Sequence, residues 1–459
     1  MAKFLFTTLP TNDLGLLTRS LPVARELATR GHEIVFCSPA PAPRHLIAEA
    51  GFENRTPRHP LYEFIAQGQS LRRLLGFVAS GQWRGPYDNL FVFFRQLIRA
   101  LPIKSVPETM EIWNTDHAGA LMGMLNEGFV RANCEALKDL IEECEPDVVV
   151  DFWNPFAVIA ARSLHKPLVT VIQADAHPAS QGFIWWKTPP ATVPTPVPIV
   201  NKVLADYALP PIGTMSELNV GDLTLVVGTP ETDPLPPGTD IQYIGPLLWQ
   251  KAEAKLPDWI DELGRDKPLI WIYSGNPRYA SSGKTLDSAV VVESCIAALS
   301  EENVNVVLTT GYHALPKQIL PLPGNFHHAQ YVPGLAMAAR SDLLIHHGGY
   351  GSCQTGLYMG KPAVIIPTFS ERESNARRVA ATGTGAFVQV ENGPHGKYVD
   401  PEELRATIQQ VLHDPAFAIN ARRMRHILRS YGGVSHAAHL ILRFWQQAGV
   451  AEKEFTSQR

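Results

Sequence analysis

The chain has 459 residues, with 40 Lys and Arg against 44 Asp and Glu, which gives a formal net charge of -4 at pH 7. This length exceeds what one hydrophobic core usually supports, so we expect two domains. The slightly acidic balance, without a dense cluster of Lys and Arg, excludes a protein that binds nucleic acid through a basic surface.

Strand-like and helix-like patterns alternate through the first half of the chain, which predicts a parallel sheet covered by helices. The short apolar runs expected to form strands are residues 3–8, 33–37, 147–152, 168–172, 223–228 and 241–244. The segments expected to form helices are residues 17–29, 43–50 and 118–144. The alternation lapses between 57 and 104, where large apolar and aromatic side chains accumulate.

The second half restarts the same alternation, so the fold class is α/β with two doubly wound parallel sheets. The expected strands are residues 268–274, 304–309, 326–331, 343–345 and 363–366. The expected helices are residues 285–299, 401–412, 419–431 and 435–447, with a short one that ends at Gly360.

One stretch of this second half predicts a ligand site. The strand at 343–345 leads directly into HHGGYGS at 346–352, where a helix must begin. Glycines let the backbone approach a ligand, and the free N–H groups and dipole of a helix start attract anions, most naturally a phosphate. The loop at 367–375 carries Glu371 at the carboxyl end of the next strand, where such sheets bind ligands. A phosphate cradle beside a carboxylate suits a nucleotide sugar.

This block resembles the donor-binding segment of family 1 glycosyltransferases of the GT-B fold, in particular the bacterial natural-product and macrolide enzymes. The matching residues are HHGGYGS at 346–352, GKP at 360–362, Pro367, Glu371 and Asn375-Ala376, with weaker matches at 21–36 and in GPLL at 245–248. The resemblance implies two Rossmann-like domains that face each other across a cleft. Residues 1–245 would bind the acceptor, 246–433 the donor, and 434–459 would form a helix that crosses back to the first domain.

The resemblance also implies the members of the site. The donor diphosphate would be held by His347, Gly349, Gly351, Ser352 and Asn276. The nucleoside would contact Tyr331, Val332 and Thr355, and the sugar Glu371 and Arg372. An acceptor cleft would include Trp83, Trp153 and Trp185, the last in a Pro-rich loop at 185–198; for most aromatic residues of 57–104, core packing is the favoured alternative.

The catalytic base of the family is missing. Relatives keep a His in a G-H-x-x-P pattern after the first strand, and this position is Leu16, which cannot accept a proton. Asp151, at the position of the carboxylate that orients that His, is the first candidate base, because burial would raise its pKa towards neutrality. A structural ion pair is an equally strong alternative for it. Asp13 is the second candidate, although turn or cap formation is favoured for this residue. His177 is the third, although a satisfied histidine of the cleft wall is favoured for it.

Two further departures concern the donor. Relatives that bind both ribose hydroxyls carry a Glu where this chain has Thr355, and some relatives that use dTDP-deoxysugars also have Thr there. The usual Gln after the D/E position is Arg372, for which a surface salt bridge to Glu373 is slightly favoured over contact with the sugar.

We therefore expect an inverting hexosyltransferase that moves a sugar from UDP or dTDP to a small hydrophobic acceptor of polyketide, terpenoid or phenolic type. No metal and no cofactor beyond the nucleotide sugar is expected, because the helix dipole and His347 would stabilise the leaving diphosphate. The alternatives are a catalytically silent nucleotide-sugar-binding or auxiliary protein and a GT-B nucleotide-sugar 2-epimerase. The five scattered cysteines and the lack of an apolar run near ~18 residues predict a cytoplasmic protein without a membrane span.

Overall fold

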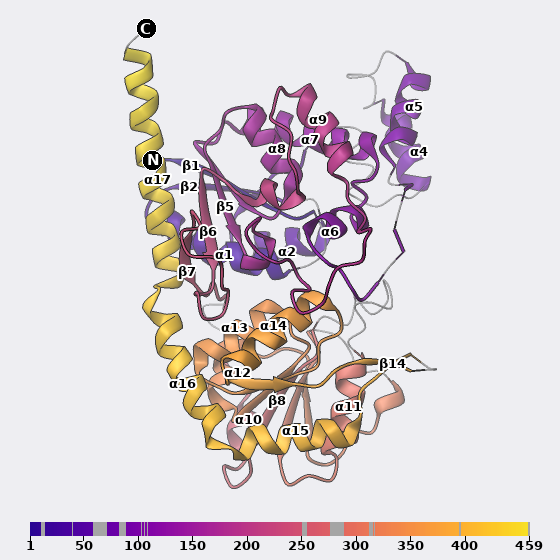
Figure 1. The fold of residues 1–459 in the computed structure, drawn as a ribbon, viewed down its shortest axis with the longest axis vertical. Coiled ribbons are helices and arrows are strands. Elements are labelled where there is room, and N and C mark those ends of the chain that lie inside the picture. The colour runs from indigo at the N-terminus through magenta and orange to yellow at the C-terminus, as the bar shows by residue number, and fades with distance from the viewer. Residues whose placement is uncertain are drawn as a thin grey trace.

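The computed structural model describes residues 1–10, 14–38, 40–57, 71–81, 89–101, 103–104, 106–107, 109–249, 255–275, 289–311, 315, 317–393 and 396–457. These residues form an elongated molecule in which two α/β halves lie end to end, each built around its own sheet (Figure 1). Among the described residues, no helix combines the length and the apolarity needed to cross a membrane.

The N-terminal half contains a seven-stranded parallel sheet of order β3-β2-β1-β4-β5-β6-β7 within the described residues. Its strands are β1 (Lys3–Thr8), β2 (Glu33–Cys37), β3 (Glu53–Asn54), β4 (Val148–Phe152), β5 (Leu168–Ile172), β6 (Leu223–Val227) and β7 (Gln242–Gly245). Its helices are α1 (Gly15–Thr29), α2 (Pro41–Glu49), α4 (Leu71–Ser80), α5 (Leu90–Ala100), α6 (Thr115–Leu121), α7 (Glu127–Cys144), α8 (Pro155–Ser163) and α9 (Val197–Asp206). The long helix expected at 118–144 is wrong, because Gly123 takes a φ of +94° and separates α6 from α7.

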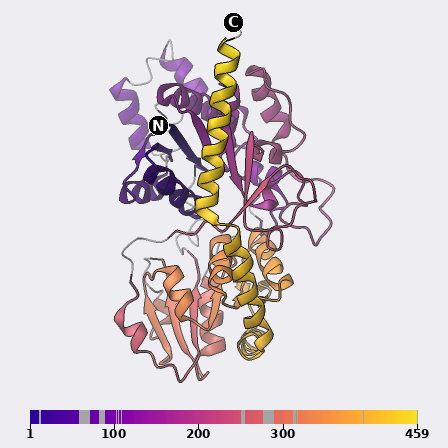
Figure 2. The same ribbon diagram turned by 90° about the vertical axis from the view of Figure 1, so that its left-hand side faces the viewer.

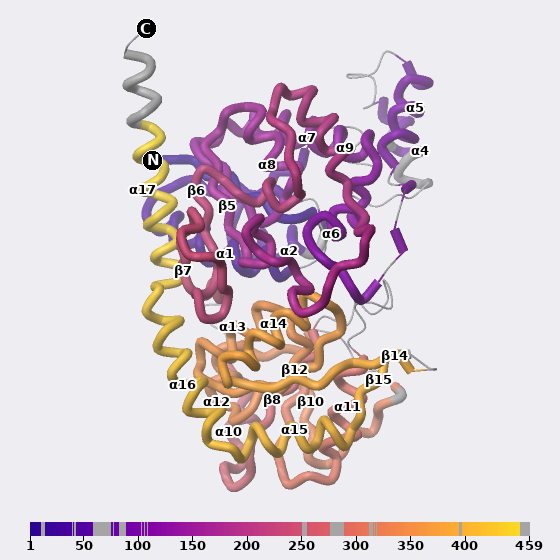
Figure 3. The backbone as a smooth tube through the Cα atoms, in the orientation of Figure 1, coloured from indigo at the N-terminus to yellow at the C-terminus, as the bar shows by residue number. Residues whose placement is uncertain are grey.

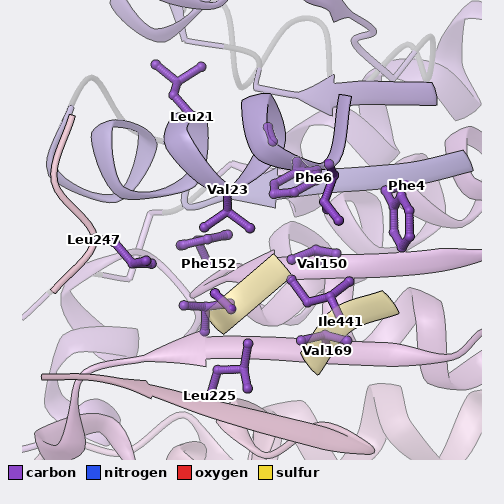
Figure 4. Packing of buried hydrophobic residues seen from close by; sticks show 14 of the residues in the cluster. Phe4, Phe6, Leu21, Val23, Val150, Phe152, Val169, Leu225, Leu247 and Ile441 are labelled. Carbon is purple, nitrogen blue, oxygen red and sulfur yellow. The ribbon is translucent and has the colours of Figure 1, made fainter. Parts of the chain in front are cut away.

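Strand alternation divides the core of this half into two layers. Phe4, Phe6 and Val150 face one side of the sheet, where they pack with residues of α1 and of the C-terminal helix (Figure 4). Leu5 and Val149 face the other side, which α7, α8 and α9 cover. Helices therefore lie on both faces of the sheet, and its carboxyl edge is left for ligands.

The C-terminal half repeats this plan with a six-stranded parallel sheet of order β10-β9-β8-β11-β12-β13 in the described part of the chain. Its strands are β8 (Leu269–Tyr273), β9 (Asn305–Thr309), β10 (Phe326–Ala329), β11 (Leu343–His346), β12 (Ala363–Ile365) and β13 (Gly385–Phe387), and a hairpin of β14 (Glu391–Gly393) and β15 (Gly396–Tyr398) lies beside it. Its helices are α10 (Asp258–Glu262), α11 (Ala289–Leu299), α12 (Gly334–Arg340), α13 (Tyr350–Met359), α14 (Ser370–Ala381), α15 (Pro401–His413) and α16 (Pro415–Ser430).

The last helix, α17 (Gly433–Ser457), returns to the N-terminal half and runs along it (Figures 2 and 3). Ala437, Ala438 and Ile441 of α17 are fully buried in the core layer that contains Phe4 and Phe6. Gly245, at the expected hinge, has a φ of +77° and lies so close to Tyr431 that a Cβ there would come within 2.9 Å of the Tyr431 Cβ. The domain boundaries at 245 and 433 stay a prediction.

Candidate functional site

The loop between β11 and α13 has the geometry of an anion site. Gly348 has a φ of +86°, and a Cβ there would lie 2.7 Å from the carbonyl oxygen of Arg372, so only glycine fits. Gly349 is the N-cap of α13, and no side chain forms a capping hydrogen bond there. The first N–H groups of the helix are therefore available to a ligand, together with the positive end of the helix dipole. As predicted, α13 ends at Gly360, with a φ of +69°.

His347 is held in this loop between two glycines. A Cβ on Gly275 would lie 2.9 Å from the His347 ring, and a Cβ on Gly349 would lie 2.5 Å from Nε2. The ring of Tyr273 makes an edge contact with it at a centroid distance of 5.7 Å. This close fit fixes the orientation of the imidazole.

Two ring nitrogens in the loop are buried without a protein partner, namely Nε2 of His346 and Nδ1 of His347. Burial lowers the pKa of His346 to about 3, and burial together with the charge of Arg372 lowers the pKa of His347 well below its usual value. Both imidazoles are neutral at pH 7. Nδ1 of His346 accepts from the N–H of Gly348 at 3.1 Å, so the free Nε2 carries the proton of that neutral ring. The His347 ring already bonds the backbone of Tyr273, so its free Nδ1 is an acceptor while the ring is neutral. Buried polar atoms normally have a partner, so both free nitrogens suit a polar ligand at this helix start.

Glu371 connects the phosphate loop to the N-terminal half. Its Oε1 accepts hydrogen bonds from Asn375 Nδ2 at 2.9 Å and from Gln173 Nε2 at 3.3 Å. Asn375 Nδ2 also donates to the carbonyl oxygen of Gly348 at 3.0 Å. Burial raises the pKa of the Glu371 carboxyl. The structure thus brings together the predicted sugar-binding carboxylate and the predicted phosphate loop.

Arg372 does not form the surface salt bridge that the sequence favoured. Its NH1 donates to Thr368 Oγ1 at 2.6 Å, and its guanidinium lies 4.8 Å from the centre of the Phe369 ring. The carboxylate of Glu373 instead pairs with Arg377 at 2.7 Å. A different arginine therefore neutralises Glu373.

The predicted nucleoside residues differ in their availability. Tyr331 is partly exposed, whereas the side chain of Val332 is buried in the core of the C-terminal half, so Val332 offers a ligand only its backbone. Thr355 donates its hydroxyl proton to the carbonyl oxygen of Gly351 within α13 at 2.8 Å. Ser352 is half-buried in the first turn of the same helix.

Asp151 lies at the carboxyl end of β4 and is buried. Its Oδ1 accepts a hydrogen bond from the Thr7 hydroxyl at 2.5 Å, and its carboxylate accepts from the backbone N–H groups of Trp153 and Asn154. Burial outweighs these donors and raises the pKa of Asp151 to about 7. Trp153 has a φ of +61°, which is rare for a large side chain. Asp151 therefore stabilises an unusual turn, and its contacts are hydrogen bonds rather than an ion pair.

The other candidate bases have different outcomes. Leu16 packs in the apolar core layer of α1, so the family His position is filled by hydrophobic contacts. His177 lines a cavity of about 260 Å³ that also contacts Leu223 and Gln242, the first residues of β6 and β7. This places His177 beside the amino ends of those strands rather than their carboxyl ends, as a residue of a cavity wall. Asp13, Asn276 and Trp83 lie outside the described residues.

The two described tryptophans of the predicted acceptor cleft make specific contacts. The ring of Trp153 meets the edge of Phe183 at 6.5 Å between centroids. Trp185 crosses to the C-terminal half, where its Nε1 donates to Ser374 Oγ of α14 at 3.1 Å. The Pro-rich loop thus contacts the helix that carries Glu371.

Sequence reasoning missed a buried polar network between the two halves. Arg378 of α14 pairs with Asp175 and with Asp233, and Ser374 donates to Asp175 at 2.9 Å. The Tyr350 hydroxyl, at the start of α13, binds Asp233 at 2.9 Å and the carbonyl oxygen of Val227 at 2.6 Å. The only sequence signal was the Tyr in the HHGGYGS motif.

Among the described residues, no group of three or more His, Cys, Asp or Glu is placed to hold a metal ion. Two halves, each with a parallel sheet, and an uncapped helix start of this kind in the second half define a protein of the GT-B class. Residues 293–430 match the family described as erythromycin biosynthesis protein CIII-like, C-terminal domain.

Curated relatives and solved structures agree with this class. A PGL/p-HBAD biosynthesis glycosyltransferase of Mycobacterium tuberculosis is 31% identical over 207 residues, which span only 44% of each chain. A PGL/p-HBAD biosynthesis rhamnosyltransferase of Mycobacterium bovis is 26% identical over 405 residues, covering 81% of this chain and 83% of its own.

The calicheamicin glycosyltransferase CalG4 superimposes with a TM-score of 0.65 at 21% identity, covering 97% of this chain and 98% of its own. The glycosyltransferase VinC, solved in complex with dTDP, gives a TM-score of 0.63 at 17% identity, covering 97% and 100%. The predicted GT-B fold is confirmed, and the chain is similar in sequence to curated glycosyltransferases.

Proposed function

We propose that this protein is an inverting glycosyltransferase that moves a sugar from a dTDP- or UDP-activated donor to a small hydrophobic acceptor. The observation that carries the proposal is the uncapped start of α13, where two buried imidazoles keep ring nitrogens without a protein partner. A diphosphate supplies the acceptor oxygens that such a site lacks. The relatedness to natural-product glycosyltransferases supports the same reading.

The residues of the site suit the transfer step. The helix N–H groups stabilise the negative charge that develops on the leaving diphosphate, and the charge of the diphosphate favours protonation of His347, whose Nδ1 then donates as well. Because this stabilisation comes from fixed dipoles, the proposal needs no metal. Glu371 accepts hydrogen bonds from sugar hydroxyls, and its existing donor Asn375 keeps it oriented.

Asp151 is the base in this proposal, because a carboxyl with a pKa of about 7 can take a proton near neutral pH. Leu16 leaves no histidine between this carboxylate and the acceptor hydroxyl. In this proposal the acceptor binds in the N-terminal half, where Trp153 and the loop of Trp185 line the cleft. A thymidine donor is favoured over a uridine donor, because Thr355 cannot hold a ribose diol in the two-oxygen manner of a Glu.

A catalytically silent nucleotide-sugar-binding protein is the second candidate, and the apolar environment of Leu16 favours it. The two candidates differ in turnover and not in nucleotide binding. Thermal stabilisation by dTDP, UDP and GDP tests the shared donor site, since a ligand at about 100 times its Kd stabilises by roughly 2.7 kcal/mol. Release of dTDP or UDP from the sugar nucleotide in the presence of an acceptor panel then separates the two.

The variant H347A tests the site itself. Loss of one hydrogen bond to a charged group costs about 1.5–3 kcal/mol, so we expect Kd for the nucleoside diphosphate to rise about 10- to 100-fold. H426A is the matched control, because His426 is exposed on α16. Equal nucleotide affinity in H347A and H426A would mean that the donor site lies elsewhere.

A further inference from the structure

A face of α5 and the turn that follows it combines exposed apolar and basic side chains, and this feature is independent of the proposed transferase activity. Phe91, Ile98 and Ile103 are 75%, 59% and 69% exposed, respectively. Arg95, Arg99 and Lys104 are also exposed. We call these six residues the α5 face. Single exposed apolar residues are normal, but a set on one helix and its turn indicates a binding surface.

The orientation of α5 is fixed by its other side. Phe93, Leu97 and Ala100 are buried, and Phe93 and Leu97 lie four positions apart, as on one side of a helix. Gly128 of α7 approaches α5 so closely that a Cβ there would lie 2.3 Å from the carbonyl oxygen of Arg99. The Asn89 side chain caps the helix by accepting from the N–H of Val92 at 2.9 Å. Because these contacts anchor the buried side of the helix, the α5 face points outward.

The charge of this face differs from that of the whole protein. Residues 89–107 contain two Arg and one Lys and no Asp or Glu, whereas the whole chain carries a net charge of -4. Within the described residues, none of these three basic side chains forms an ion pair with a carboxylate. Their positive charge is therefore available to a partner.

The geometry points to an anionic lipid surface as the partner of the α5 face; we propose that the protein docks there peripherally. Helices that lie in a membrane interface bury Phe and Ile side chains while flanking Arg and Lys contact anionic headgroups. In Figure 1, α4 and α5 lie at the outer edge of the N-terminal half, on the side opposite α17. Leu75 of α4 adds another apolar side chain, 61% exposed.

A second copy of the chain is a poorer partner for the same surface. A two-fold contact brings the same patch of each copy together, so Arg95 and Arg99 would face their own equivalents. Like charges in such a contact repel, whereas an anionic bilayer neutralises both arginines and takes up the apolar side chains.

Co-sedimentation of the full-length protein with vesicles tests the proposal. We expect binding to vesicles of phosphatidylcholine with about 30% phosphatidylglycerol, whose surface potential is negative, and weak binding to pure phosphatidylcholine. Each basic residue near an anionic surface contributes about fivefold, so R95Q/R99Q should lower the partition coefficient about 25-fold. Raising the salt concentration to about 0.5 M should weaken binding of the unchanged protein to a similar degree.

Matched variants on α16 provide the controls. Arg422 and Arg423 are exposed there, and Ile419 is 56% exposed, so R422Q/R423Q and I419S remove the same chemistry from another surface. These variants should bind vesicles like the unchanged protein, whereas F91S/I98S should bind at least tenfold less. The circular dichroism spectrum and Tm of each variant establish that it is folded.

Three results would overturn the proposal. The first is no binding to anionic vesicles, or binding to neutral and anionic vesicles that is equally strong. The second is a loss of vesicle binding that is the same for the α5 and the α16 variants. The third is a dimer in sedimentation velocity that F91S/I98S converts to a monomer, which would assign the α5 face to self-association. Nucleotide binding is measured on the same samples, so failure here is distinct from failure of the donor site.

Discussion

Replacing Arg378 with Met tests whether the two halves are held together by the buried network. The Arg378 side chain is 13% exposed, and those of its partners Asp175 and Asp233 are 2% and 1% exposed. Removing the guanidinium leaves two buried carboxylates without a cation, and breaking a buried pair in this way costs about 3–5 kcal/mol. At about 2–4 °C per kcal/mol for a unit of this size, R378M should lower Tm by about 6–20 °C.

The loss of stability should also depend on pH. Burial already raises the pKa of Asp175 to about 6 in spite of the nearby Arg378, and removing that cation raises it further. A carboxyl with a folded pKa above its unfolded value stabilises the fold below the unfolded pKa, and this stabilisation is lost as pH rises through the folded pKa. R378M should therefore be closest to the unchanged protein near pH 5 and furthest from it near pH 8.

Two further variants complete the experiment, which is read by calorimetry and by urea denaturation. R422M removes an exposed arginine and should leave Tm unchanged. The triple variant R378M/D175N/D233N removes the uncompensated charges as well, and should recover most of the lost stability. A Tm for R378M equal to that of R422M, or a deficit that grows on acidification, would refute this reasoning.

Three predictions concern the site. G349A should weaken dTDP binding about tenfold or more, measured by titration calorimetry, because its Cβ would lie 2.5 Å from His347 Nε2; unchanged affinity would mean that the ring is not held by this glycine. D151N should lower kcat about 100-fold or more and remove the acid limb near pH 7, and T7V should move that limb to higher pH, because the Thr7 hydroxyl stabilises the carboxylate. A pH profile that D151N leaves intact would assign the base elsewhere. T355E should raise affinity for UDP relative to dTDP about tenfold in competition binding, and an unchanged ratio would argue against a ribose contact at this position.

The sequence predicted the elements whose signals are local. Apolar runs of three to seven residues became the central strands, and the glycine motif correctly located the start and end of α13. The helix α8 was not predicted, because PFAVIAARS is buried over most of its surface and has little helical alternation. The hairpin of β14 and β15 was also missed, since strands of three residues carry almost no periodic signal.

Contacts between the halves could not be predicted in the same way. Arg378 lies 203 positions from Asp175 and 145 from Asp233, and nothing in the intervening sequence relates them. The pairing of Glu373 with Arg377 instead of Arg372 has a local cause, because residues four apart share one side of a helix and adjacent residues do not. The sequence thus indicated which residues form the donor loop, while the partners that orient them came from the fold.

Because Leu16 cannot accept a proton, the proposed base is Asp151, and a base must keep a lone pair free for the proton that it takes. The Asp151 carboxylate offers about four lone-pair positions, and the Thr7 hydroxyl and the two backbone N–H groups occupy most of them. These donors favour the ionised form, yet burial prevails and keeps the pKa at about 7. If Asp151 only held the turn at Trp153, D151N would lower stability and leave the pH dependence of turnover unchanged. A base and a turn residue therefore differ in the pH profile, and this readout separates them even when both roles reduce the rate.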